Sequence, residues 1–157
     1  MAWVEIMKTD TAGIADFVAL QQSCSDYYAR AFDVAKATAY FDRPTHTTMR
    51  AFIWRDVDYE LNLAVMLKNP TTLQLKVVGI RHFANINTAV QMFLLKVKSL
   101  LTEYGVKKLY AIWSDDVLPD TLSFYQKITN GFSAGGFVGT VVTNPKPSVF
   151  VINSGVL

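Results

Sequence analysis

The sequence has a single cysteine, Cys24, among its 157 residues. One thiol excludes an internal disulfide and any metal site that requires several cysteines. Cys24 has no histidine near it in the sequence, so a buried or surface thiol is favoured over a catalytic nucleophile. Histidine is also scarce. His46 and His82 are the only two, and without a neighbouring cysteine they make a poor zinc site.

The sequence also lacks any concentration of charge or any long apolar run. Lys and Arg number 15 and Asp and Glu number 13, which gives a net charge of +2, and the basic residues are scattered. Nucleic-acid binding is therefore disfavoured. The apolar runs are too short for a transmembrane segment, and the N-terminus has no signal-peptide pattern. We expect an intracellular protein.

Hydrophobic residues make up 51% of the chain and charged residues 18%. This composition and length predict one globular domain over residues 1–157 with a substantial core. The apolar excess has two explanations that the sequence does not separate. It fits a large core in a mixed α/β fold, and it fits a surface that is covered in an oligomer or a larger assembly.

The clearest pattern lies in residues 73–137. Residues 73–80 alternate and then become continuously apolar, which predicts a strand, and residues 108–113 predict another. Between them, apolar residues recur at steps of three and four and predict a helix over 88–104, which Asn87 or Thr88 caps and Gly105 ends. Strand, helix and strand with short connections predict a right-handed βαβ unit with parallel strands.

The other segments are predicted from the same patterns. Residues 49–54 are compatible with either a helix or a strand, and residues 131–136 read as a flexible, glycine-rich exit from a helix. The remaining predictions are a strand at 2–7, a helix from about residue 14, a second helix or helical turn at 32–41, a β-hairpin over 60–84, a helix from Pro119, and strands at 137–142 and 148–152.

This order of elements resembles the fold of the GCN5-related N-acetyltransferases (GNAT). In residues, the resemblance is most specific in Thr121-Leu-Ser-Phe-Tyr-Gln-Lys-Ile128 followed by Gly131-Phe132, although the gap before Gly131 is longer than usual. The family has an aromatic pair on a helix and then Gly-Phe entering the next strand. The resemblance implies an α+β, three-layer fold: a central mixed sheet of about six or seven strands, containing the parallel βαβ unit and flanked by helices.

The segment that opens the long helix departs from the family pattern. GNAT enzymes bind the acyl-CoA pyrophosphate at a Gln/Arg-x-x-Gly-x-Gly/Ala turn, where backbone N–H groups and a helix N-terminus face the phosphates. Here residues 83–90 read Phe-Ala-Asn-Ile-Asn-Thr-Ala-Val, without glycine. Asn85, Asn87 and Thr88 would offer a weaker cradle of amides and polar side chains. Gly79, inside the preceding strand, marks a bulge or a close backbone approach.

The resemblance also implies candidate catalytic and cofactor residues. Tyr125 occupies the place of a family tyrosine that protonates the departing CoA thiolate; the alternative is a ring that packs beside Phe124. Ser114 stands where the family has an asparagine that contacts the cofactor arm. Glu60 and Asp58 are candidates for the base that deprotonates the amine, although a loop carboxylate is usually a solvated surface group.

Two further polar clusters have simpler explanations. Asp115, Asp116 and Asp120 could supply a base or bind a cation, but acidic residues at a helix start are favoured by the helix dipole. Arg81 and His82 could attract a phosphate, but they also suit a strand end in water. We favour the simpler explanation for both clusters.

Two functions follow from this sequence. The missing glycines favour a degenerate GNAT fold that binds no cofactor and serves as a structural or protein-interaction subunit, with a protein partner or a second copy. The glycine-poor helix entrance is similar to that of GNAT-like internal virion proteins of short-tailed phages, which would place the protein inside a phage particle. The alternative is an acetyl-CoA-dependent N-acyltransferase acting on an amine. The sequence leaves open whether the protein is an enzyme.

Overall fold

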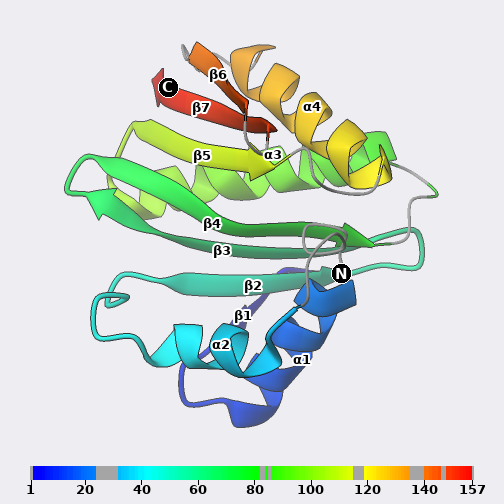
Figure 1. Ribbon diagram of the computed structural model, residues 1–157, viewed down its shortest axis with the longest axis vertical. Helices are drawn as coiled ribbons and strands as arrows, with labels where there is room; N and C mark the ends of the chain where they lie inside the picture. Colours follow the sequence, from blue (N-terminus) through cyan, green and yellow to red (C-terminus); the bar gives the residue numbers. More distant parts are fainter. Residues whose placement is uncertain are drawn as a thin grey trace.

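The computed structural model describes residues 2–23, 32–81, 84, 86–114, 119–134, 140–145 and 148–156, with backbone alone for residues 112–114, 119–121 and from 133 onward. Its centre is a sheet of seven strands in the order β1-β2-β3-β4-β5-β7-β6 (Figure 1). All neighbouring strands are antiparallel except β4 and β5, which are parallel. The mixed sheet therefore has the parallel pair that the βαβ pattern predicts.

The strands are β1 (Val4–Ile6), β2 (Arg50–Arg55), β3 (Glu60–Asn69), β4 (Thr72–Arg81), β5 (Lys108–Ser114), β6 (Thr140–Pro145) and β7 (Ser148–Val156). The helices are α1 (Thr11–Ser23), α2 (Val34–Ala39), the 3-10 helix η2 (Tyr40–Asp42), α3 (Ile86–Tyr104) and α4 (Pro119–Ala134). Within the described part of the chain, no helix is both long and apolar enough to cross a membrane.

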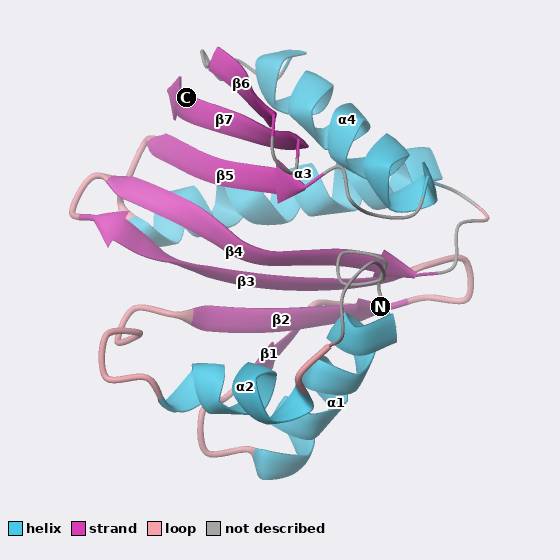
Figure 2. Cartoon of the chain, viewed as in Figure 1, coloured by secondary structure: helices cyan, strands magenta, loops and turns pink. Residues whose placement is uncertain are grey.

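The helices form two outer layers around the sheet. Helices α1 and α2 lie on one side, and α3 and α4 on the other (Figures 1 and 2). Each side has its own hydrophobic core. The larger core lies under α3 and α4 and includes Phe93, Phe124 and Phe132. The smaller core lies under α1 and includes Phe17 and Phe41. This layering arises because each strand presents alternate side chains to opposite faces of the sheet.

Helix α3 forms and ends as its sequence predicts. Its buried residues Ala89, Val90, Phe93, Val97, Leu100 and Leu101 form one face. Gly105 has a φ of 70°, a left-handed conformation that glycine adopts without strain. Its N–H donates to the Thr102 carbonyl at 3.1 Å, and the Val106 N–H donates to the Leu101 carbonyl at 3.0 Å. These two bonds satisfy carbonyls that the helix end would otherwise leave without donors.

Most of the predicted elements are confirmed, and the structure decides or corrects the others. Residues 49–54, which the sequence left undecided, lie mostly in β2. The flexible exit predicted at Gly131 is wrong, because residues 131–134 continue α4. A Cβ atom on Gly131 would lie 2.4 Å from Cδ1 of Leu94, so this glycine lets α4 pack closely on α3. The glycine at position 131 is therefore explained by close packing of the two helices rather than by chain flexibility.

Candidate functional site

Strands β4 and β5 separate at a bulge in β4. Ala64 of β3 pairs with Val77 and Val65 pairs with Leu75, so Lys76 has no partner on β3. Pairing between β4 and β5 covers only Thr72 to Leu75 and ends at that same place, although both strands continue. A bulge bends its strand and increases the local twist, which explains why the strands part here. Of the two alternatives for Gly79, a bulge or a close backbone approach, the bulge is wrong, because Gly79 pairs in register with Asn62.

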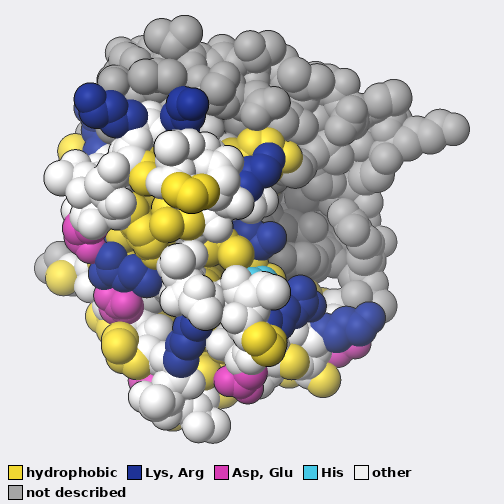
Figure 3. Space-filling view, turned by 90° about the vertical axis from the view of Figure 1, so that its left-hand side faces the viewer, with side chains coloured by type: hydrophobic (Ala, Val, Ile, Leu, Met, Phe, Trp, Pro, Cys, Tyr) yellow, Lys and Arg dark blue, Asp and Glu magenta, His cyan; other side chains and the backbone are white. Residues whose placement is uncertain are grey.

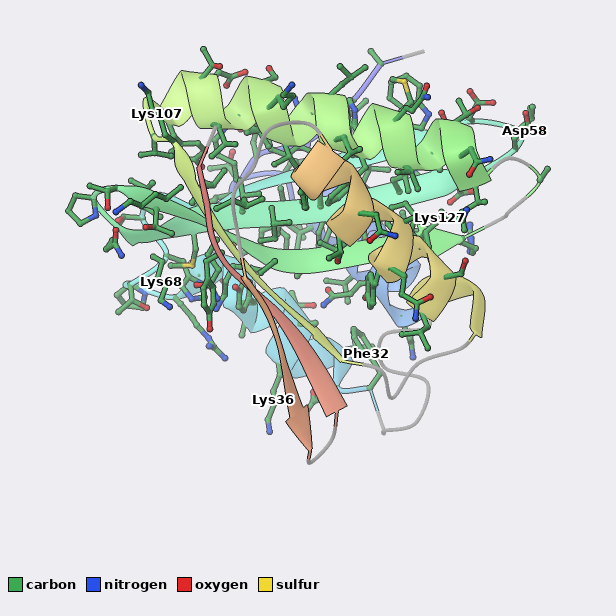
Figure 4. The ribbon with its side chains drawn as sticks, turned by 90° about the horizontal axis from the view of Figure 1, so that it is seen from above. Phe32, Lys36, Asp58, Lys68, Lys107 and Lys127 are labelled. Carbon is green, nitrogen blue, oxygen red and sulfur yellow. The ribbon has the colours of Figure 1, made fainter. Side chains whose placement is uncertain are left out.

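Helix α4 spans the opening between the two strands. It contacts α3, β4 and β7, while β5 stays paired with β7 as far as Ser114. Seen from above, β4 runs straight while β5 and β7 turn away from it (Figure 4). Beyond the bulge, no strand among the described residues pairs with the edge of β4 that faces this opening. Backbone N–H and C=O groups on such an edge can pair with side chains or with a ligand.

Tyr125 reaches that edge from α4. Its side chain is buried, and its hydroxyl donates to the Val78 carbonyl at 3.0 Å. Its ring also packs against Phe124, with 6.4 Å between the ring centroids. The two interpretations of Tyr125, a packed core ring and a proton donor, are therefore compatible. The ring belongs to the core, while the hydroxyl lies at the edge of β4. A hydroxyl in this position can hand its proton to an atom that replaces the carbonyl as acceptor.

The start of α3 lies close to α4, and a lysine side chain of α4 contacts it. Asn87 and Thr88 are exposed residues in the first turn of α3, which begins at Ile86, so neither precedes the helix as the predicted cap would. Lys127 of α4 donates from Nζ to Oδ1 of Asn87 at 3.3 Å. The first backbone N–H groups of a helix have no acceptor within it, and the helix dipole attracts anions. Lys127 adds a full positive charge to this end.

Lys127 was not predicted from the sequence. It is separated from Asn87 by 40 positions, and a lone lysine on an amphipathic helix is ordinarily a solvated surface residue. The same is true of Lys76, whose position in a bulge depends on the register between β3 and β4. The position of Lys127 becomes clear only from the packing of α4 against α3 and β4. The position of Lys76 becomes clear only from the pairing of β3 with β4.

Glu60 lies in a chain of ion pairs rather than in an open site. Its Oε2 is 2.7 Å from a guanidinium nitrogen of Arg81 and 3.7 Å from Nε of Arg55. Arg55 in turn pairs with Asp16 of α1 at 2.6 Å. The hydrogen bond from Arg55 lowers the pKa of Asp16. Two guanidinium groups contact the same Glu60 oxygen, which a base would need free, so this geometry disfavours Glu60 as a base.

The structure describes some of the other residues predicted for the site. Ser114 is the last residue of β5 and pairs with Val149 across the sheet, so its backbone lies at the mouth of the opening. Asp58 is exposed, lies at the end of the molecule where α3 begins, and accepts the Ala84 N–H at its carbonyl (Figure 4). Five of the residues singled out from the sequence lie outside the described part of the chain: Cys24, His82, Asn85, Asp115 and Asp116.

His46 has a structural setting. It is buried, its Nδ1 lies 2.8 Å from the Tyr40 carbonyl, and its ring lies 4.2 Å from the Tyr40 ring. These contacts tie η2 to the loop before β2. Among the residues that the structure describes, no group of three His, Cys, Asp or Glu side chains could hold a metal ion.

No protein-family model matches this chain, and no curated protein sequence does. Solved structures do match it over its whole length. The aminoglycoside 6'-acetyltransferase type Ii superposes with a TM-score of 0.64 at 12% identity, covering 100% of this chain and 98% of its own. The fold is that of the GNAT acetyltransferases.

Two further GNAT-fold structures show the same likeness. An IAA acetyltransferase from Bacillus cereus has a TM-score of 0.62 at 11% identity and covers 99% of each chain. The spermidine N-acetyltransferase from Vibrio cholerae, in complex with CoA and spermine, has a TM-score of 0.58 at 12% identity and covers 99% of this chain and 94% of its own. Identities this low establish the fold, so the activity must be argued from the residues of the site.

Proposed function

We propose that this protein is an acyl-CoA-dependent N-acyltransferase that acts on an amine. The observation that carries the proposal is the opening between β4 and β5, with the Tyr125 hydroxyl on the unpaired edge of β4. A degenerate fold without a ligand would gain stability by continuing the ladder between the two strands instead of leaving backbone groups on one edge. The separation is built in by the bulge at Lys76.

The residues around the opening suit an acyl-CoA. The first turn of α3 and the Lys127 ammonium would hold the pyrophosphate, and the free edge of β4 would bind the amides of the pantetheine arm. When bound, the acyl-CoA supplies a thioester that an amine can attack. The Tyr125 hydroxyl, which donates to the Val78 carbonyl, would give its proton to the departing thiolate. The burial of Tyr125 keeps water from this proton.

The pyrophosphate position can be tested by calorimetric titration of acetyl-CoA against matched variants. We expect Lys127→Met to weaken binding about fivefold, because it removes a positive charge worth about 1 kcal/mol to a phosphate at an exposed site. Asn87→Asp should weaken binding more, since it places a negative charge beside the phosphates. The same change should not lower the melting temperature, because a carboxylate in the first turn favours the helix.

Lys98→Met is the matched control, because Lys98 is an exposed lysine on α3 away from its first turn. It should bind acetyl-CoA as the unchanged protein does. The proposed pyrophosphate site is wrong if all three variants bind equally well. The whole proposal is wrong if the unchanged protein binds no acetyl-CoA at millimolar concentration.

A second candidate function is an interaction subunit, such as a component of a phage particle, that has kept the fold without the chemistry. The observation that favours it is the absence of glycine from residues 83–90, because a residue with a Cβ atom limits how closely a phosphate can approach the backbone. This function requires a protein partner or a second copy of the chain. It predicts no acetyl-CoA binding together with a defined oligomer in sedimentation velocity, and saturable binding would count against it.

A further inference from the structure

A cavity lies on the face of the sheet opposite to α3. It has a volume of about 420 Å³ and is walled by α1, α2, η2 and the bulge of β4. Both Lys76 and Val77 line it, so the bulge turns two consecutive side chains of β4 toward the same cavity. Phe32 and Lys36, from its other wall, lie on the side of the sheet opposite to α3 (Figure 4).

The charges in this cavity are strongly unbalanced. Its lining includes the cations Lys36, Arg43 and Lys76 and a single acid, Asp33. The Asp33 carboxylate accepts the Lys36 backbone N–H at 3.0 Å, so it is engaged in capping α2. None of the three cations forms an ion pair with a described carboxylate. The cavity therefore holds positive charge that the described carboxylates do not neutralise.

The Lys76 ammonium is partly buried and lies near another positive charge. Partial burial and the nearby charge of Arg43 both lower its pKa. Its Nζ lies 5.9 Å from the centre of the Tyr40 ring, and the Arg43 guanidinium lies 5.3 Å from the same ring. Both cations therefore lie near the Tyr40 ring, and neither forms an ion pair with a described carboxylate. This arrangement costs free energy that a bound anion would recover.

The rest of the wall is apolar and largely aromatic. Phe17 and Phe41 are fully buried beneath the cavity, and Phe32 and Tyr40 are partly exposed on it. Figure 3 shows Lys and Arg side chains interspersed with hydrophobic ones on the side of the molecule that lies to the left in Figure 1. An apolar wall with a few charged groups at one side is typical of a site for a small organic molecule.

We propose that this cavity binds a small organic anion, a carboxylate or a phosphate carried on an aromatic or apolar body. The body lies on the Phe32 and Tyr40 rings, and the anion sits between Lys76 and Arg43. Under the proposed function, which this step takes as given, the ligand is the acceptor amine, because the bulge that lines the cavity also opens the acyl-CoA site. The acceptor then carries an acid group, and polycations such as the spermine bound by the Vibrio cholerae enzyme are excluded.

Binding can be measured without acetyl-CoA, so the result does not depend on the acyltransferase proposal. Phenyl phosphate and benzoate are the anionic probes, and benzylamine is a cation with the same ring. In ligand-observed NMR titrations we expect saturable binding of both anions and none of benzylamine. Lys76→Met should weaken phenyl phosphate binding about tenfold, as the loss of a charge-assisted hydrogen bond does.

Lys36→Met is a second variant, on an exposed helix position where the fold is not at risk, and it should also weaken binding. Lys98→Met, on the opposite side of the sheet, is the control and should leave the affinity unchanged. Equal binding of benzylamine and phenyl phosphate would overturn the proposal. So would unchanged affinity in both Lys76→Met and Lys36→Met, or displacement of phenyl phosphate by saturating chloride.

Discussion

Replacing Tyr125 with phenylalanine is expected to lower the rate of acyl transfer about 100-fold, because general acid catalysis typically contributes that much or more. The ring and its packing on Phe124 remain, so the site keeps its shape. Only the hydroxyl that faces the Val78 carbonyl is lost. The affinity for acetyl-CoA should change little, because the hydroxyl acts on the leaving thiolate rather than on the pyrophosphate.

The measurement is steady-state release of CoA thiol with an amine acceptor, together with calorimetric binding of acetyl-CoA to both proteins. A drop in turnover with unchanged binding identifies Tyr125 as the acid. The variant also leaves the buried Val78 carbonyl without this donor, which costs about 1–3 kcal/mol of stability. Rates are therefore compared well below the melting temperature of the variant. A variant that turns over at the rate of the unchanged protein would remove Tyr125 from the mechanism.

The largest stability effect is expected at Phe93. Its side chain is fully buried in α3, and its ring meets Phe124 at 5.7 Å edge-to-face and Phe132 at 6.4 Å. Phe93→Ala should lower the free energy of unfolding by about 3–5 kcal/mol, because it removes apolar contact and leaves a cavity. Domains are stable by about 5–15 kcal/mol in total, so this variant approaches the limit of folding.

Leu95→Ala is the matched control, two positions along the same helix. Leu95 is 61% exposed, so its truncation should change the free energy of unfolding by less than about 0.5 kcal/mol. Urea denaturation followed by circular dichroism measures both variants. Similar losses from the two variants would show that Phe93 does not hold α3 to α4 and the sheet.

The sequence predicted the elements that depend on local periodicity. Helix α3 could be recognised because its apolar residues repeat over many turns and Gly105 marks its end. The hairpin of β3 and β4 and the parallel pair of β4 and β5 followed from alternation and short connections. Gly131 was misread because glycine is usually a helix breaker, whereas here the packing of α4 on Leu94 outweighs that preference.

The site was harder to predict than the fold, because its features come from pairing between distant segments. The bulge at Lys76 depends on which residue of β3 faces which residue of β4, and no local pattern specifies this. The sequence placed Tyr125 through a family resemblance, but it could not show that the hydroxyl reaches the Val78 carbonyl. The three cations that line the cavity beside α1 and α2 come from α2, the segment after η2 and β4, and only the fold brings them to one cavity.

Under the proposed function, acyl-CoA binds between β4 and β5 beyond the bulge. The most direct measurement follows backbone amide chemical shifts by NMR during titration with acetyl-CoA. We expect large, saturable shifts at residues 77–80 and in the first turn of α3, with little change over residues 72–75, where β4 stays paired with β5. Saturable binding with shifts confined elsewhere, or no shifts at millimolar acetyl-CoA, would contradict it.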